Sequence, residues 1–249
     1  MTASPEVEAA DNHQLPSLTS LIVEAVRLVG KHAGEYYGFA GWLLVPLLLS
    51  VGAYATGGSL GILILNIANA ATFMLVMWLL AACILLTAAH VMHPERTVDP
   101  RHLSRISWER TFGLVVTLLA AAVLELFGII ALVVPGLIIS VYLSFASQEA
   151  ILHNHTFLRG LAASRDRVKG RFFAVFFRVV GLTAFAAVGY VMIGSLVVSI
   201  ASTLGIMTPN DLLTAPPLWF ATLLGLIEIA ALPILITAHT LLYLSLKRR

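Results

Sequence analysis

The sequence predicts an all-α, polytopic membrane protein with six transmembrane helices and two short amphipathic helices at the cytosolic membrane surface. Two observations lead to this fold class. Of the 249 residues, 59% are hydrophobic and 11% are charged, whereas soluble domains carry about 25% charged residues. The hydrophobic residues also gather in long uncharged runs, which is typical of a chain that crosses a bilayer.

A polar, acidic stretch precedes the first apolar run. Residues 1–17 have too little apolar surface to fold, so we expect a disordered cytosolic tail followed by one transmembrane domain over 18–249. A span needs roughly 20 apolar residues to cross about 30 Å of hydrocarbon. Runs of suitable length predict six spans, at about 38–55, 60–90, 111–131, 134–152, 172–201 and 217–245.

The longest apolar stretch, Thr111 to Gln148, contains one ionisable side chain, Glu125. As a single helix it would extend roughly 57 Å at 1.5 Å per residue, nearly twice the hydrocarbon core. Pro135 and Gly136 lie inside the stretch, and this pair is a strong helix breaker. We therefore predict two spans here, joined by a very short outer turn with Pro135 and Gly136 as its structural residues.

Basic residues fall on one side of this arrangement. They lie before span 1, between spans 2 and 3, between spans 4 and 5, just inside span 5 and at the end of the chain. The connections 1–2, 3–4 and 5–6 contain none. Because Lys and Arg favour the cytosolic side of a membrane, we expect both termini in the cytosol.

Two segments beside the spans, 18–32 and 157–172, combine an apolar stripe with basic residues elsewhere on the helix. Such helices lie in the headgroup layer and attract anionic lipid, or they pack beneath the bundle, and the sequence leaves both alternatives open. On the first interpretation, six basic side chains are expected to contact lipid headgroups. They are Arg27, Lys31, Arg159, Arg165, Arg167 and Lys169.

A sequence pattern in 131–173 joins an apolar-Pro-Gly turn, an inward span and a short loop to Leu-x-x-Ser and Lys-Gly. Its positions are Pro135, Gly136, Leu161, Ser164, Lys169 and Gly170. The pattern resembles the YciC-like family of bacterial six-span membrane proteins, and also the membrane domain attached to some glycerophosphoryl diester phosphodiesterases. Two positions depart from it: a proline late in the inward span is absent, and Asn154 replaces an acidic residue.

The resemblance implies a six-span fold and a location in the bacterial cytoplasmic (inner) membrane. It implies no hydrolase activity, because the chain has no phosphodiesterase domain.

Four ionisable residues lie within or near the spans, where burial is costly unless they are paired or hydrated. Helix rise places Glu125 roughly 15 Å and Glu228 roughly 17 Å from the outer side, so they are a candidate intramembrane polar site. Together they would relay protons or bind a cation, and separately they would serve helix packing. Glu149 and Arg178 lie toward the inner side and are a candidate ion pair.

Two histidines end similar apolar stretches, His90 after 84–89 and His239 after 234–238, which leaves an ancestral duplication open. We expect each histidine to be hydrogen-bonded at a helix interface, and we predict no metal site. The single cysteine, Cys83, is expected to pack in the apolar interior.

The chain contains no recognisable catalytic motif, and its soluble loops are too short for a catalytic domain. We therefore expect no catalytic residues, no enzyme activity and no cofactor. The sequence favours a structural or helper protein in envelope or lipid organisation, with anionic phospholipid and an unidentified membrane protein as partners and no nucleic acid. The alternative is a small transporter or lipid translocator that uses the intramembrane carboxylates.

Overall fold

The computed structural model describes residues 15–95, 98–208, 211 and 216–247, and within them the regular structure is helical, without a strand. The elements are α2 (Leu18–Lys31), α3 (Ala33–Ala40), η2 (Gly41–Leu43), α4 (Leu44–Thr56), α5 (Gly58–Met92), α6 (Pro100–Ala131), α7 (Val133–Leu143), α8 (Ala146–Leu152), α9 (Leu158–Val168), α10 (Phe172–Thr203) and α12 (Leu218–Lys247). Six segments among the described residues are long and apolar enough to cross a membrane, which confirms the predicted all-α, six-span fold class.

Helix ends extend beyond several of the predicted limits. The first span covers Ala33–Thr56, and α6 begins at Pro100 because Asp99 caps it by accepting a hydrogen bond from the N–H of Arg101. Residues 1–14 of the predicted tail lie outside the described residues. The last residue of that tail, Ser17, is already the N-cap of α2.

The α6–α7 hairpin confirms the division of the longest apolar stretch, with its turn between the predicted spans, but Pro135 and Gly136 lie within α7 and not in the turn itself. Leu132, between the two helices, has an extended backbone. Pro135 lies in the first turn of α7, where its missing N–H removes no helical hydrogen bond. Gly136 allows α7 to pack closely against α6, because a Cβ added there would lie 2.8 Å from the backbone N of Ile129 in α6.

The fourth candidate span, Val134–Leu152, has the predicted bounds, but its helix is interrupted. The interruption lies between α7 and α8, and Ser164 of α9 bridges it. The Ser164 hydroxyl accepts from the N–H of Phe145 at 3.1 Å and donates to the carbonyl of Tyr142 at 2.7 Å. A buried side chain thus satisfies backbone groups that the break leaves without helical partners.

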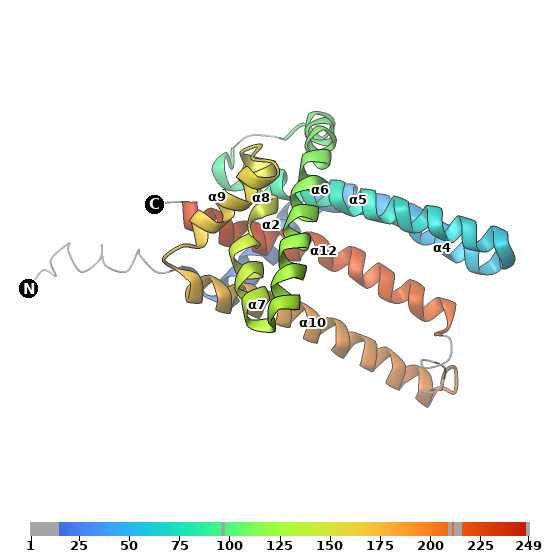
Figure 1. The fold of residues 1–249 in the computed structure, drawn as a ribbon. Helices are drawn as coiled ribbons and strands as arrows, with labels where there is room; N and C mark the ends of the chain where they lie inside the picture. The colour runs from blue at the N-terminus through green and yellow to red at the C-terminus, as the bar shows by residue number, and fades with distance from the viewer. Residues whose placement is uncertain (1–14, 96–97, 209–210, 212–215, 248–249) are drawn as a thin grey trace, which may run out of the picture.

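The helices extend from a common base near the C-terminus of the chain. Figure 1 shows the α4–α5 hairpin and the α10–α12 pair reaching toward the same side, while the α6–α7 hairpin runs at a steep angle to them. The base contains the largest buried core cluster, formed by residues of α2, α7–α10 and α12. Toward the far ends the spans are less enclosed. In α10, only 6% of the apolar 18-residue stretch that qualifies it as a span is buried within the protein.

The amphipathic helix α2 packs against protein along its apolar stripe. Leu21 and Ala25 are fully buried in the same core cluster as Leu242 of α12. Arg27 and Lys31 are exposed on the other faces of the helix. The apolar stripe of α2 therefore packs beneath the bundle, which is one of the two alternatives for this segment. Its basic residues remain exposed, as contact with lipid headgroups would require.

The two similar stretches that precede His90 and His239 meet inside the base. The Oγ1 atoms of Thr87 and Thr237 lie 3.2 Å apart, and the hydroxyl of Tyr36 lies 3.0 Å from that of Thr87. These hydroxyls satisfy one another in a buried position, as polar groups must between packed transmembrane helices. This contact does not test the ancestral duplication, which stays open.

Candidate functional site

Glu149 of α8 is the most enclosed carboxylate described, with a side chain 1% exposed. Its Oε1 accepts hydrogen bonds from Nε of Arg167 and from the hydroxyl of Tyr243, each at 2.8 Å. Its Oε2 lies 3.2 Å from Nδ1 of both His153 and His155. These five residues, here called the Glu149 cluster, come from α8, the following loop, α9 and α12.

The Glu149 cluster is arranged to hold helices together. Arg167 balances the buried charge of Glu149 and also lies over the ring of Tyr243, with its guanidinium carbon 5.1 Å from the ring centroid. Both carboxylate oxygens of Glu149 have polar partners, so neither buried oxygen is left without a hydrogen-bond donor. A closed, charge-balanced set of this kind is chemically suited to fastening α8, α9 and α12 in one arrangement.

The predicted ion pair between Glu149 and Arg178 is wrong. Arg178 instead donates to the backbone carbonyls of Leu15 and Pro16, each at 2.7 Å, and to that of Ala174. The helical register of α10 turns Arg178 toward the segment that leads into α2, away from α8. Similar depth therefore did not bring the two side chains together, and Arg178 ties the start of α2 to α10.

The basic residues expected to contact lipid divide into two groups. Arg27, Lys31, Arg159, Arg165 and Lys169 are exposed, as such contact requires. Arg167 is different, because its side chain is only 25% exposed and is engaged by Glu149. The lipid contacts themselves stay a prediction, and we remove Arg167 from the set.

One face of α9 carries both apolar and basic exposed residues. Leu158, Ala162, Arg165 and Lys169 recur at spacings of four, three and four residues, which places them on one side of the helix. The adjacent face, with Leu161 and Val168, is buried against the bundle. The exposed face therefore runs from an apolar first turn to a basic last turn.

An apolar groove lies beside the first turn of α9. It has a volume of about 420 Å³. Its lining residues, which define the α6–α9 groove, are Val116, Leu119, Ala120, Val123 and Leu124 of α6 with Phe157 and Leu158. The groove has the apolar lining and the position on a membrane span that would suit a hydrocarbon chain.

The loop before α9 is fixed to α6 beside this groove. The N–H of Phe157 donates to the Thr117 hydroxyl at 2.8 Å, although Phe157 has a left-handed backbone with φ +53°. Gly160 lies so close to the loop that an added Cβ would be 2.3 Å from the carbonyl oxygen of His155. These contacts set the distance between α9 and α6.

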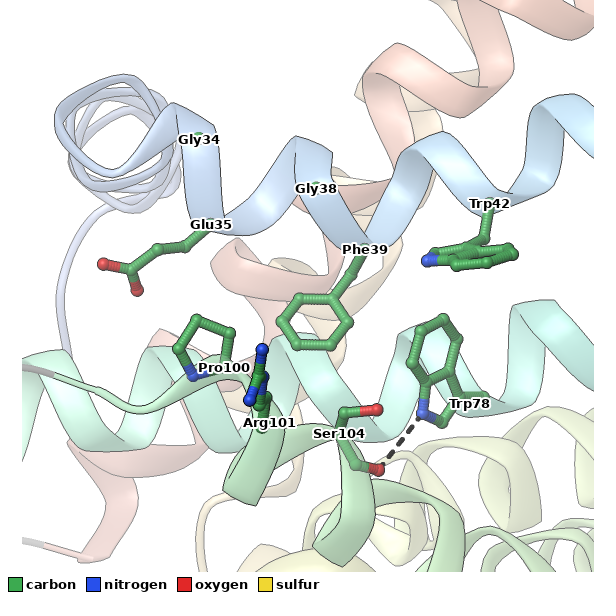
Figure 2. Close-up of a pocket in the computed structure, with 9 residues that line it drawn as sticks. All are labelled: Gly34, Glu35, Gly38, Phe39, Trp42, Trp78, Pro100, Arg101 and Ser104. Atoms are coloured by element: carbon green, nitrogen blue, oxygen red, sulfur yellow. Dashed lines mark hydrogen bonds between the residues drawn. The ribbon is translucent and has the colours of Figure 1, made fainter.

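A second cavity, of about 500 Å³, lies where α3 meets α5 and α6 (Figure 2). Glu35 and Arg101 contribute opposite charges to its lining, and Trp42 and Trp78 contribute aromatic rings. The indole N–H of Trp78 donates to the carbonyl of Ser104 at 3.4 Å. We call this space the Trp78 cavity.

Glu125 and Glu228, the candidate intramembrane site, have separate surroundings. Glu125 of α6 is partly buried and makes a side-chain hydrogen bond with Ser140 of α7. Glu228 of α12 is exposed. Within the described part of the chain no hydrogen bond joins the two, so the packing alternative suits Glu125 better than a shared site does.

The two histidines have side-chain partners on other helices, as expected, and the cysteine is packed in the apolar interior. Nε2 of His90 lies 2.9 Å from Oε2 of Glu35, and Nδ1 of His239 lies 2.9 Å from Nε2 of Gln148. Cys83 is fully buried in the core cluster that contains Trp78.

Comparison with known proteins adds no identification: no protein family, curated protein or solved structure matches this chain.

Sequence reasoning missed most of the Glu149 cluster. One local signal was present, because Glu149 and His153 are four residues apart and so lie on the same side of a helix. Arg167 and Tyr243 gave no such signal, since they are 18 and 94 residues away from Glu149. Only the packing of α9 and α12 brings them to the carboxylate.

Proposed function

We propose that this chain is a non-enzymatic, multi-pass protein of the bacterial cytoplasmic membrane that organises anionic lipid at the cytosolic face. One observation carries the proposal: the exposed basic end of α9 continues from an apolar groove on α6. A phospholipid combines the same two features, since it has a phosphate headgroup and an acyl chain. A structural or helper role follows, because lipid is held and no chemistry is performed on it.

The energetics favour anionic over zwitterionic lipid. Each Lys or Arg near an anionic membrane surface contributes about 1 kcal/mol of attraction. On α9 the exposed residues Arg159, Arg165 and Lys169 outnumber the one acidic residue, Asp166. The α6–α9 groove adds an apolar contribution that does not depend on headgroup charge, so the basic residues set selectivity and the groove adds affinity.

Membership of the YciC-like family belongs to the same proposal. Two residues of the sequence pattern in 131–173 have structural roles that explain why the pattern contains them. Ser164 bridges the break between α7 and α8, and Gly170 has φ +84° in the turn that leads into α10. The pattern thus describes a way of joining the fourth and fifth spans through α9.

The transporter alternative receives less support. It needs Glu125 and Glu228 to share a hydrated site, but Glu125 bonds with Ser140 and neither carboxylate lines the α6–α9 groove or the Trp78 cavity. We therefore propose lipid organisation and do not propose transport.

The proposed orientation, with both termini in the cytosol, predicts the outcome of reporter fusions. Fusions at Gly57, Pro135 and Asp211 should report outside, and fusions at Asp99 and Ser164 should report inside. Lys and Arg occur in the connections that contain Asp99 and Ser164, and none occurs in the three connections of the first group. The Pro135 fusion is the sharpest test, since the α6–α7 hairpin runs at a steep angle to the other spans (Figure 1). A cytosolic signal at Pro135 would show that this hairpin does not cross.

The lipid proposal predicts that charge removal on α9 weakens the preference for anionic lipid. We expect the double variant Arg165→Gln/Lys169→Gln to lower the preference for phosphatidylglycerol over phosphatidylcholine by roughly fivefold per charge. The preference can be measured by electron paramagnetic resonance, from the motionally restricted fraction of spin-labelled lipids around reconstituted protein. Ala120→Phe, which narrows the groove, should weaken binding of both lipids.

The matched control is Arg101→Gln/Arg105→Gln. These two residues are also exposed, four residues apart and on the side assigned to the cytosol, but they lie on α6 away from the groove. The control should change the lipid preference much less than the α9 variant. Equal effects of the two double variants would mean that the basic rim attracts lipid without a site on α9.

A further inference from the structure

Three side chains that can bind metal ions converge where α2, α3 and α5 meet. They are His32, Glu35 and His90, and one donor atom from each lies within 4.8 Å of the others. Oε2 of Glu35 lies 2.9 Å from Nε2 of His90, and Oε1 of Glu35 lies 3.8 Å from Nδ1 of His32. The two imidazole rings stack, with centroids 3.7 Å apart.

The fold holds each of these side chains in place for a separate reason. His32 is both the C-cap of α2 and the N-cap of α3, so it lies at the bend between these helices. Glu35 follows one turn later in α3, on the same side as His32. His90 is in the last turn of α5, 55 residues away from Glu35, and its side chain is only 4% exposed.

We propose that His32, Glu35 and His90 form a binding site for a divalent transition-metal ion of the Zn²⁺ type. Two imidazoles and one carboxylate are a donor set used by zinc sites that keep a fourth position open. Bond lengths of about 2.0–2.2 Å around a tetrahedral ion place its donors roughly 3.3–3.5 Å apart. In the structure the three donor atoms lie within 4.8 Å of one another, so side-chain rotation must bring them closer when the ion binds.

The local charges are compatible with a bound cation. Glu35 supplies a carboxylate, and the histidines must be neutral to act as ligands. The basic residue closest in sequence to His32 is Lys31, at the end of α2. Its side chain is exposed, so its positive charge is not buried beside the site.

An ion would have an access route to this site. Glu35 also lines the Trp78 cavity, and Figure 2 shows its carboxylate at one end of that cavity with Trp42 and Trp78 at the other. Water from the cavity would supply the fourth ligand. A bound ion would fix the bend between α2 and α3 to the end of α5, which goes beyond lipid organisation and does not depend on it.

The test uses the purified full chain in detergent, without a polyhistidine tag and after treatment with a chelator. Co²⁺ is the probe, because tetrahedral coordination by nitrogen and oxygen gives it a characteristic visible absorption. We expect one Co²⁺ per chain, displaced by Zn²⁺, and thermal stabilisation by either ion. His32→Ala, Glu35→Gln and His90→Ala should each weaken binding by at least about tenfold.

Two controls separate this site from other histidines. His93→Ala removes an exposed histidine just beyond α5, and His155→Ala removes a member of the Glu149 cluster. Both should leave Co²⁺ binding unchanged. His90→Ala disturbs a buried position, but His32 and Glu35 are partly exposed, so their variants should remain folded. Absence of stoichiometric binding to the wild type, or binding that survives both His32→Ala and Glu35→Gln, would overturn the proposal.

Discussion

Replacing Glu149 with leucine should lower the free energy of unfolding by about 3–5 kcal/mol, the loss typical of breaking a buried ion pair. The carboxylate is 1% exposed, and its removal leaves Arg167 and the hydroxyl of Tyr243 without their shared acceptor. The measurement is thermal or denaturant unfolding of the purified protein in detergent. Glu149→Gln should have a smaller effect, because an amide oxygen still accepts a hydrogen bond.

The matched control for this prediction is Glu109→Leu. Glu109 also pairs with an arginine, Arg105, at 3.0 Å, but both side chains are more than half exposed. Exposed pairs of this kind contribute little, so the control should change stability by less than about 1 kcal/mol. If the two leucine variants were equally stable, the Glu149 cluster would not be what fastens α8, α9 and α12.

The substitution Gly136→Val should destabilise the α6–α7 hairpin by about 1–3 kcal/mol. A Cβ at Gly136 would lie 2.8 Å from the backbone N and 3.0 Å from the Cα of Ile129, and a backbone cannot give way as a flexible side chain can. Gly128 faces the same contact, since a Cβ there would lie 2.9 Å from the Cα of Gly136. Unfolding in detergent measures the effect.

Gly189→Val is the control for the hairpin prediction. Gly189 lies inside α10, and a Cβ added there meets no atom within 4 Å. Valine at this position should therefore change stability by no more than about 0.5 kcal/mol. A loss at Gly189 as large as at Gly136 would indicate a general intolerance of β-branched residues in these helices, without a special role for the close contact.

The sequence was sufficient for the number and class of the spans because both depend on local properties. Hydrophobic run length decides whether a segment can cross a bilayer, and Pro135 with Gly136 marks where one run must divide. The bounds were less accurate where a capping residue extends a helix, as Asp99 does for α6. The break between α7 and α8 was not predicted, because Ser164, which bridges it, lies in another helix.

The candidate sites required information that one sequence does not contain. Depth in the membrane can be estimated from helix rise, but whether two side chains meet depends on how each helix is rotated about its axis. For this reason the pairing of Glu149 with Arg178 was wrong, and Glu125 has Ser140 as its partner. His90 and Glu35 are likewise 55 residues apart in the sequence, although they lie in contact in the structure.

The most direct test of the proposed function is native mass spectrometry of the lipids that stay bound after gentle extraction from a bacterial membrane. We predict that the wild-type protein retains anionic phospholipid in excess of its share in that membrane, because the basic end of α9 lies beside an apolar groove. The Arg165→Gln/Lys169→Gln variant should lose this excess while remaining folded. Retained lipid that matches the bulk membrane composition, or an excess that survives in the variant, would contradict the account.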